Sequence, residues 1–485
     1  MRLARGAVWS VLGFIGSQGA NLVTSVVIAR MMGKSGFGEY GMVTSTVGTF
    51  GVFAGAGLGV TATRHVAQYR KAEPARAGAV LRLSIRAALV SGVLASAALY
   101  LLAPVVAADV ISAGHLVTAL RAGCLLLLFS TLGGAQTGAL SGLERFRAIA
   151  GLNVLRGLLG LPLSLLLLWY YGLTGAVVGI GLANACACLA GEFVLHRECR
   201  LAGIAVSGHR IRDEIPLLWR FSLPAFLSGA LIGPVMWLAN TLIARQQNGY
   251  AELGLVNAAS QWRMLIMTVP GLISTAALPI LSAQTEARQD PADSRRVLEM
   301  VHAAALMVAL PLSVAIMFVA DIIMSWYGKE FTGTPAVLVG FAFGTAASAM
   351  GTSLATVIVA RGRVWFGLAQ NLLWAVVLLG IIYYLAPQLG ALSYALGYAV
   401  SYFLLLLWSC WALRSVLPPR FLSRTACAMG CLLLMTALAL MLPATPRLFV
   451  ALPAVALTTW LCVFPLTPPE LRAQVLARLL RKSTT

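Results

Sequence analysis

Two arginines lie deep inside apolar segments of the sequence, and their position indicates that they bind an anion. Arg263 is near the middle of a long apolar run, with Trp262 beside it and Pro270 further along. Arg156 lies in the apolar run that follows Arg147. A charge at the centre of a membrane helix costs roughly 2.5–3.5 kcal/mol on insertion scales. Because no Asp or Glu lies comparably deep, we expect both arginines to face a cavity for an anionic substrate.

Amide side chains in the apolar segments form a second set of candidate ligands. Amides and aromatic faces bind sugars, and guanidinium groups bind diphosphate through paired hydrogen bonds. Amides inside a bilayer also act as interhelical contacts, which is the structural alternative. Together with Arg263 and Arg156, the residues expected to bind substrate are Gln18, Asn21, Arg64, Arg121, Asn153, Asn257, Gln261, Trp262 and Asn371.

The arginines also have structural alternatives. Arg263 could bond backbone carbonyls and brace a kink. Arg156 is close enough to one end of its apolar run to extend its side chain to the membrane surface. Arg64 could anchor the end of its helix instead of contacting a phosphate head group. Arg121 lies at a shallower depth than Arg263.

A pair of charges occurs twice in the sequence, at equivalent places after two apolar runs. Arg30 is followed by Glu39, and Arg245 is followed by Glu252. Local pairs within each hairpin would contribute little stability. The alternative is a gate, in which Arg30 meets Glu252 and Arg245 meets Glu39 and so closes the outer mouth of the cavity.

Composition assigns the chain to the polytopic α-helical membrane proteins. It is 59% hydrophobic and 11% charged, with a mean hydropathy of +0.87. Apolar runs of about twenty residues recur throughout, each long enough for a membrane helix, and the runs do not alternate as barrel strands do. Phosphate-binding loops, zinc patterns and nucleophile elbows are missing from the sequence, which argues against an enzyme or an ATP-driven pump. The eight cysteines lack His or acidic partners for a metal site, so no cofactor is expected.

The basic residues predict the orientation of the chain in the membrane. We place fourteen spans at about 8–30, 40–63, 79–104, 114–141, 148–171, 173–195, 221–244, 253–282, 300–324, 336–360, 364–386, 390–412, 425–443 and 448–466. Of the 35 Lys and Arg residues, 27 then fall on one side, 6 on the other and 2 within spans. This asymmetry places both termini in the cytoplasm. The net charge of +19 is thereby explained without nucleic acid.

The sequence contains an internal duplication. The segment Ile28-Ala29-Arg30 followed by Glu39 and Gly41 recurs as Ile243-Ala244-Arg245 followed by Glu252 and Gly254. Six spans in each repeat predict two parallel lobes related by an axis along the membrane normal. The predicted domains are a first lobe at 1–200, a basic cytoplasmic linker at 201–218, a second lobe at 219–415, an extra helix pair at 420–467, and a tail at 468–485. We expect this amphipathic tail to lie on anionic lipid.

Several of these motifs together resemble one transporter family. They are Ile28-Ala29-Arg30-Met31-Met32-Gly33, Gly36-Phe37-Gly38-Glu39-Tyr40-Gly41, Gly57-Leu58-Gly59 before Arg64, and Asn257-Ala258-Ala259 through Arg263 to Pro270 and Leu278-Pro279-Ile280. Over about residues 5–415 the chain resembles the polysaccharide transporter branch of the multidrug/oligosaccharidyl-lipid/polysaccharide exporter superfamily. That branch includes O-antigen and exopolysaccharide flippases.

The resemblance implies a V-shaped, two-lobed transporter of the bacterial inner membrane. It would move undecaprenyl-diphosphate-linked oligosaccharide from the cytoplasmic to the outer leaflet by alternating access. Polysaccharide polymerase and export machinery would be its partners, and a proton, a sodium ion or the membrane potential could drive it. The fourteen spans also resemble the lipid II flippases of the superfamily, in which the extra helix pair forms a lipid-tail groove. A third alternative is a membrane scaffold of a polysaccharide synthase complex that does not transport.

Overall fold

The structure, a computed structural model, describes residues 2–55, 57–204, 214, 230–286, 291–361, 363–415, 417–419 and 421–460. Within these ranges the regular structure is helical throughout, so the predicted all-α membrane class is confirmed. Most of the predicted linker and the whole predicted tail at 468–485 lie outside the described residues.

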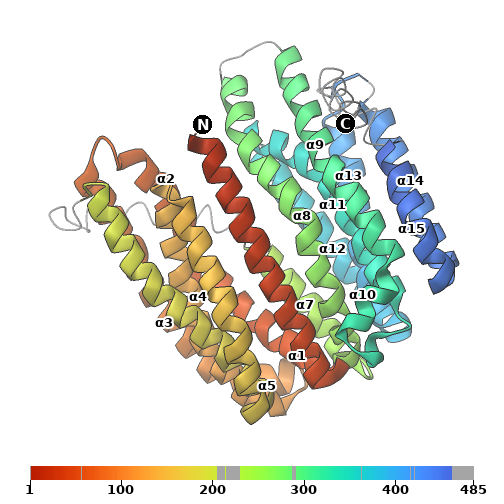
Figure 1. The fold of residues 1–485 in the computed structure, drawn as a ribbon, viewed down its shortest axis with the longest axis horizontal. Helices are drawn as coiled ribbons and strands as arrows, with labels where there is room; N and C mark the ends of the chain where they lie inside the picture. The colour runs from red at the N-terminus through yellow and green to blue at the C-terminus, as the bar shows by residue number, and fades with distance from the viewer. Residues whose placement is uncertain are drawn as a thin grey trace, which may run out of the picture. The chain divides into compact units, whose positions relative to one another are not determined.

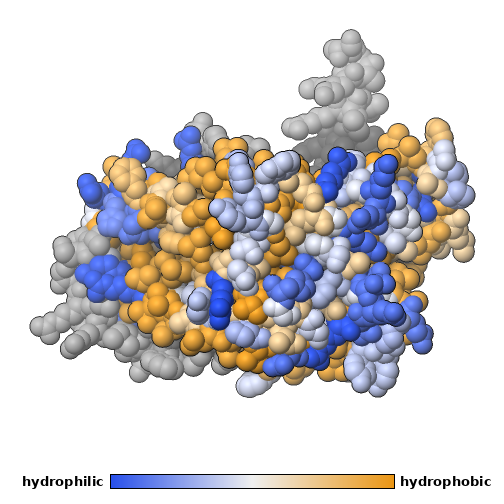
Figure 2. All heavy atoms as spheres, turned by 90° about the horizontal axis from the view of Figure 1, so that it is seen from below, coloured by the Kyte–Doolittle hydropathy of each residue, from blue (hydrophilic) through white to orange (hydrophobic). Residues whose placement is uncertain are grey.

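The helices have the length and composition of membrane spans. Among the described residues, eight helices are long and apolar enough to cross a bilayer, or nine if one bent pair counts as a single span. Two shorter apolar helices are α7 (Ile232–Ala244) and α15 (Ala444–Thr458). Figure 2 looks onto the helix ends and shows hydrophilic and hydrophobic residues mixed on that face, whereas large apolar side chains are exposed along the helices. A bilayer can cover such a surface, whereas water would not tolerate it.

The first of two compact units comprises Met1–Gly254. Its helices are α1 (Arg2–Gly55), α2 (Leu58–Tyr69), α3 (Pro74–Val105), α4 (Val117–Gly142), α5 (Phe146–Leu201), α7, and the start of α8 (Gly249–Glu286) (Figure 1). Helix α5 packs against α1 and α4, and α4 in turn packs against α2 and α3. Helix α4 is therefore the centre of this unit.

Glycines with positive φ mark the places where predicted spans meet. Helices α1 and α5 each consist of two helical segments, joined at Gly33 (φ 72°) and Gly172 (φ 58°). In the second unit, Gly390 (φ 50°) separates α12 from α13. Glycine adopts this backbone region without the steric cost that a Cβ atom brings. The breaks predicted between residues 30 and 40 and near residue 172 are confirmed.

The second unit comprises Leu255–Thr485. It contains the rest of α8, α9 (Pro291–Phe318), α10 (Ala320–Tyr327), α11 (Pro335–Ala360), α12 (Val364–Leu389), α13 (Ala391–Ala412), α14 (Phe421–Met441) and α15. Helix α11 packs against α9, α13 and α14, and it is the most buried candidate span in the described part of the chain. Helices α14 and α15 pack against each other and against α9, as Figure 1 shows.

Buried polar contacts hold the C-terminal helix pair to its unit. Arg447, only 6% exposed, places Nη1 2.8 Å from Asp321 Oδ2 of α10 and donates Nη2 to the Leu442 carbonyl at 2.8 Å. His302 of α9 lies 2.8 Å from the Ser353 hydroxyl of α11 and 3.5 Å from the Thr425 hydroxyl of α14. These contacts make α14 and α15 an integral part of the second unit.

Candidate functional site

Arg156 lies on α5 with its guanidinium against α4. A Cβ atom on Gly133 would lie 3.2 Å from Arg156 Nη2, so the missing side chain makes room for this group. Its Nη1 donates to Asn153 Oδ1 at 3.5 Å, a long hydrogen bond. Its Nε is buried and has no hydrogen-bond partner among the described residues. The unit thus holds a partly satisfied cation at the contact of α4 and α5.

The polar residues around Arg156 connect the helices of the first unit. Gln136 of α4 donates Nε2 to the Cys188 carbonyl at 3.1 Å and to Glu192 Oε2 at 3.0 Å, both on α5. On α1, the predicted ligand Asn21 donates Nδ2 to Gln18 Oε1 at 3.3 Å. Gln136 therefore has a structural role, while Gln18 and Asn21 form a local pair.

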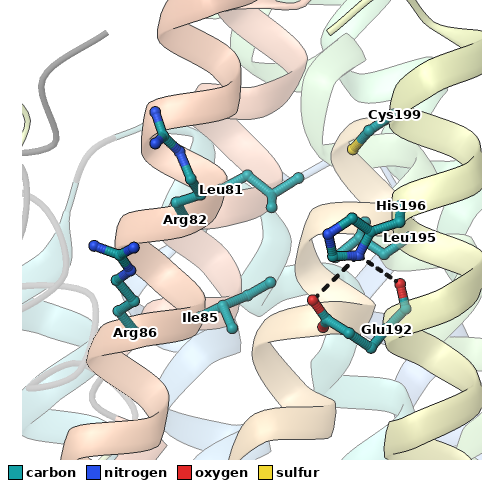
Figure 3. Close-up of a pocket in the computed structure, with 8 residues that line it drawn as sticks. All are labelled: Leu81, Arg82, Ile85, Arg86, Glu192, Leu195, His196 and Cys199. Carbon is teal, nitrogen blue, oxygen red and sulfur yellow. Dashed lines mark hydrogen bonds and ion pairs between the residues drawn. The ribbon is translucent and has the colours of Figure 1, made fainter. Parts of the chain in front are cut away.

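A small hollow of about 220 Å³ lies between α3 and α5 near Glu192. Figure 3 shows His196 turned toward Glu192, with Nδ1 3.3 Å from the carboxylate. In the same view, Ile85 points from α3 toward α5, whereas the guanidinium groups of Arg82 and Arg86 point away from His196. Both helices therefore contribute apolar and polar residues to its lining.

A larger hollow of the first unit is lined by glycines. It consists of two adjoining parts of about 490 and 460 Å³ that share Gly59, Val60 and Gly134. We call it the glycine trough. Added Cβ atoms at Gly48, Gly55 or Gly134 would meet no atom within 4 Å, so these glycines leave the space open. Arg64, an exposed residue of α2, lines one part of the trough.

Two glycines one turn apart on α4 should respond differently to alanine. A Cβ atom on Gly138 would lie 2.2 Å from the Gly59 carbonyl oxygen, whereas one on Gly134 would meet nothing. Gly138→Ala must push α2 from α4, which should destabilise the protein by about 1–3 kcal/mol. In detergent, the melting temperature should be clearly lower for Gly138→Ala than for wild type, and it should be unchanged for Gly134→Ala. Equal melting temperatures for the two variants would contradict this packing.

Arg121 does not join the other predicted ligands. Its guanidinium carbon lies 4.6 Å from the ring centroid of Tyr100 on α3, and the side chain is exposed. Fifteen residues separate it from Gln136 on α4, a helical distance of about 22 Å. The cation–π contact gives Arg121 a surface role far from the level of Arg156.

The four predicted gate residues belong to the first unit, where α1 meets the start of α8. The crossing is close, because Cβ atoms on Gly38 and Gly254 would collide with the backbone of the opposite helix. Lys34 Nζ lies 3.5 Å from Glu252 Oε1. We call this crossing the α1–α8 junction.

The remaining gate residues have partners around the same junction. Glu39 Oε1 lies 3.0 Å from His115 Nε2, and Arg245 donates to the Asp109 carbonyl. Arg30 is exposed on α1. The pairing of Arg30 with Glu252 and of Arg245 with Glu39 stays a prediction.

In the second unit, Arg263 of α8 lies against an aromatic helix face. Its guanidinium carbon is 5.5 Å from the ring centroid of Tyr398 on α13. Its Nε is buried without a hydrogen-bond partner in the described residues. The contact with Tyr398 is an electrostatic attraction to the π face, which is stronger when both groups are desolvated. Arg263 is thus half-buried against an aromatic surface, without an acidic partner in the described part of the chain.

The other predicted ligands of the second unit have different surroundings. Trp262 is 9% exposed, with its ring centroid 5.8 Å from that of Trp326 on α10. Its indole Nε1 is buried without a partner among the described residues. Asn257, Gln261 and Asn371 are half-buried.

Sequence reasoning missed an aromatic set on α12 and α13. Tyr394, Tyr398 and Tyr402 recur every four residues on α13, which places them on one helix face. Trp374 of α12 lies 6.1 Å from Tyr402 between ring centroids. The four-residue spacing of the tyrosines was the available signal, but the sequence does not show that this face meets Arg263.

Comparisons with known proteins agree with this fold. A profile of the family described as "Polysaccharide biosynthesis protein" matches residues 3–285, more than half of the chain. The EPS I polysaccharide export inner membrane protein EpsE of Ralstonia nicotianae is 24% identical over 402 residues, covering 81% of this chain and 89% of its own.

Solved structures share the fold at low identity. A lipid II flippase MurJ structure in an inward closed conformation matches with a TM-score of 0.73 and 12% identity, over 93% of this chain and 98% of its own. An inward-facing multidrug resistance MATE family transporter of the MOP superfamily matches with a TM-score of 0.61 and 15% identity, over 82% and 95%. The chain shares the fold of these transporters, and it belongs to the polysaccharide biosynthesis protein family.

Proposed function

We propose that this protein is an inner-membrane flippase for undecaprenyl-diphosphate-linked oligosaccharide. It moves the repeat unit of an O-antigen or exopolysaccharide from the cytoplasmic to the outer leaflet by alternating access. The termini lie in the cytoplasm, as the distribution of Lys and Arg predicts. It makes and breaks no covalent bond.

The observation that carries the proposal is one half-buried arginine in each unit that has no carboxylate partner among the described residues. Arg156 and Arg263 each keep a buried Nε with no acceptor in the described residues. An uncompensated charge in a membrane protein is costly and marks a functional site by default. A diphosphate supplies the negative charge and the oxygen acceptors that both guanidinium groups lack.

The relatives support the same class of substrate. EpsE is described as a polysaccharide export inner membrane protein, and the MurJ structure is that of a lipid II flippase. A lipid-diphosphate carrier of a polysaccharide unit is anionic, which fits the two arginines. The proposed ligands of its diphosphate are Arg156 and Arg263, with Arg64 as a first contact beside the glycine trough. The half-buried amides and Trp262 would contact sugar.

A second candidate substrate is lipid II, the peptidoglycan precursor. The fold match to MurJ and the packing of α14 and α15 onto α9 favour it. It has the same polyprenyl diphosphate and differs in its sugars and peptide. Both substrates would therefore make the same diphosphate contacts with the arginines, and they would differ in the groups that contact the amide side chains.

Reconstitution into liposomes tests the function. Polyprenyl-diphosphate oligosaccharide with a fluorescent sugar is placed in both leaflets, and an impermeant reagent that destroys the fluorophore irreversibly is added outside. Without protein, about half of the fluorescence should survive, because the inner leaflet is protected. With protein, the protected fraction should fall toward zero. A protected fraction that stays at half would contradict transport and favour a non-transporting scaffold of a synthase complex. Unlabelled lipid II is then added as a competitor. If lipid II is also a substrate, it should slow the flipping of the labelled oligosaccharide.

Charge exchange tests the proposed gate at the α1–α8 junction. Arg30→Glu and Glu252→Arg should each slow transport, and the double variant should recover part of the rate if the two residues meet. The matched control exchanges Lys34 and Glu252, the pair found 3.5 Å apart. A double Arg30/Glu252 variant no faster than the slower single variant would argue against the gate.

A further inference from the structure

The face of α13 that meets Arg263 is built from three tyrosines, which we call the tyrosine ladder: Tyr394, Tyr398 and Tyr402. The ring centroids of Tyr398 and Tyr402 lie 4.7 Å apart. Tyr394 and Tyr398 are only 2% and 1% exposed. The ladder is therefore a packed internal surface and not a face open to lipid.

Neighbouring helices hold the ladder in place. Phe341 of α11 contacts two of its rings, at centroid distances of 5.6 Å from Tyr394 and 5.2 Å from Tyr398. A Cβ atom on Gly344 would lie 2.5 Å from Tyr398 Cδ1, so α11 closes against this ring. Rotation of the Tyr398 ring away from its position would require α11 to move.

Arg263 is oriented by this fixed surface. Its guanidinium lies over the Tyr398 ring, and the Tyr398 side chain interacts favourably with the charge. The Nε atom is buried and has no acceptor among the described residues. The phenol thus attracts the guanidinium, and the Nε donor stays available for a ligand. A side chain immobilised before binding loses less conformational entropy when a ligand arrives.

We propose that Tyr398, supported by Tyr402, is a positioning residue that holds the Arg263 guanidinium ready for a phosphate of the lipid-linked substrate. The ring attracts the cation without neutralising it, whereas a carboxylate in this place would compete with phosphate. The hydroxyl fixes the rotation of the planar group. This inference rests on the proposed function, because the role of Tyr398 depends on Arg263 binding a diphosphate.

The test compares Tyr398→Phe with Tyr398→Leu in the liposome assay. Tyr398→Phe keeps the ring and loses the hydroxyl, and Tyr398→Leu loses both. Tyr394→Phe is the matched control, since it removes an equally buried hydroxyl one turn away whose ring stacks on Phe341. The readouts are the half-saturating substrate concentration, the maximal rate, the melting temperature, and the affinity for farnesyl diphosphate measured by calorimetry.

We expect Tyr398→Phe to raise the half-saturating concentration and the farnesyl diphosphate Kd by about 5- to 10-fold, as loss of the polar group that orients the guanidinium predicts. Its maximal rate and melting temperature should stay near wild type. Tyr398→Leu should weaken binding further, and Tyr394→Phe should leave it unchanged. If Tyr398→Leu does not fold, the affinity of Tyr398→Phe alone tests the positioning role of Tyr398.

Two results would overturn the inference in distinguishable ways. If Arg263→Ala abolishes diphosphate binding but Tyr398→Phe binds as wild type, the ladder only packs α13 and the proposed function stands. If Arg263→Ala also binds and transports as wild type, the diphosphate role of Arg263 fails together with that of the ladder. A lower melting temperature of Tyr398→Phe with unchanged affinity would likewise assign Tyr398 to packing alone.

Discussion

Arg263→Ala should lower the initial rate of flipping at subsaturating substrate by about 10- to 100-fold. Hydrogen bonds to charged groups contribute about 1.5–3 kcal/mol, and each 1.4 kcal/mol corresponds to a factor of about ten. The rate of Arg263→Lys should lie between those of wild type and Arg263→Ala, because lysine keeps the positive charge but lacks the planar guanidinium with its paired donors. The measurement is the rate at which the protected fluorescence disappears in liposomes at equal protein content.

A matched control shows whether the removal of any arginine that lies over an aromatic ring lowers the transport rate. Arg414 also lies over an aromatic ring, with its guanidinium carbon 5.6 Å from the Trp411 centroid, but it is exposed near the end of α13. Arg414→Ala should transport as wild type. An Arg263→Ala variant that keeps the wild-type rate would reduce Arg263 to a structural brace and leave Arg156 alone as the diphosphate ligand.

Arg447→Ala should cause a clear loss of stability, by about 1–3 kcal/mol, because it leaves the half-buried Asp321 carboxylate and the Leu442 carbonyl without their donor. Arg447 is 6% exposed and bonds both Asp321 and the Leu442 carbonyl. These contacts connect the start of α15 with α10. Thermal melting in detergent should show the loss, and α14–α15 should become protease-sensitive before the rest of the unit.

Asp321→Asn is the milder companion variant. The amide oxygen still accepts from Arg447 Nη1, so the side chain keeps a partner although the charge is lost. We expect it to melt between wild type and Arg447→Ala. If Arg447→Ala melts as wild type, the C-terminal pair is held by apolar packing, and Arg447 contributes only a surface charge.

Local features of the sequence predicted much of the fold. Span length and apolar composition depend only on neighbouring residues, so the helical membrane class followed directly. The breaks between the spans predicted at 8–30 and 40–63, and at 148–171 and 173–195, lie at Gly33 and Gly172, where glycine tolerates a positive φ. The place of Arg263 within a helix followed from its place in an apolar run.

The partners of the site residues could not be predicted in the same way. Which face of α13 meets Arg263 depends on helix packing between segments more than a hundred residues apart, and no local periodicity encodes it. The same holds for Arg121, whose partner is the ring of Tyr100 on a neighbouring helix. Glycine composition was visible in the sequence, but the trough appears only when α2 and α4 pack together.

The most direct test of the central claim is the leaflet location of lipid-linked glycan in cells. Spheroplasts from cells with wild-type protein, without it, and with Arg263→Ala at a matched level are treated with an impermeant glycan-modifying reagent. We predict accessible glycan with wild-type protein and inaccessible glycan, accumulated on the cytoplasmic leaflet, in the other two. Equal accessibility with and without the protein, in cells that retain no second transporter for that glycan, would contradict the flippase account.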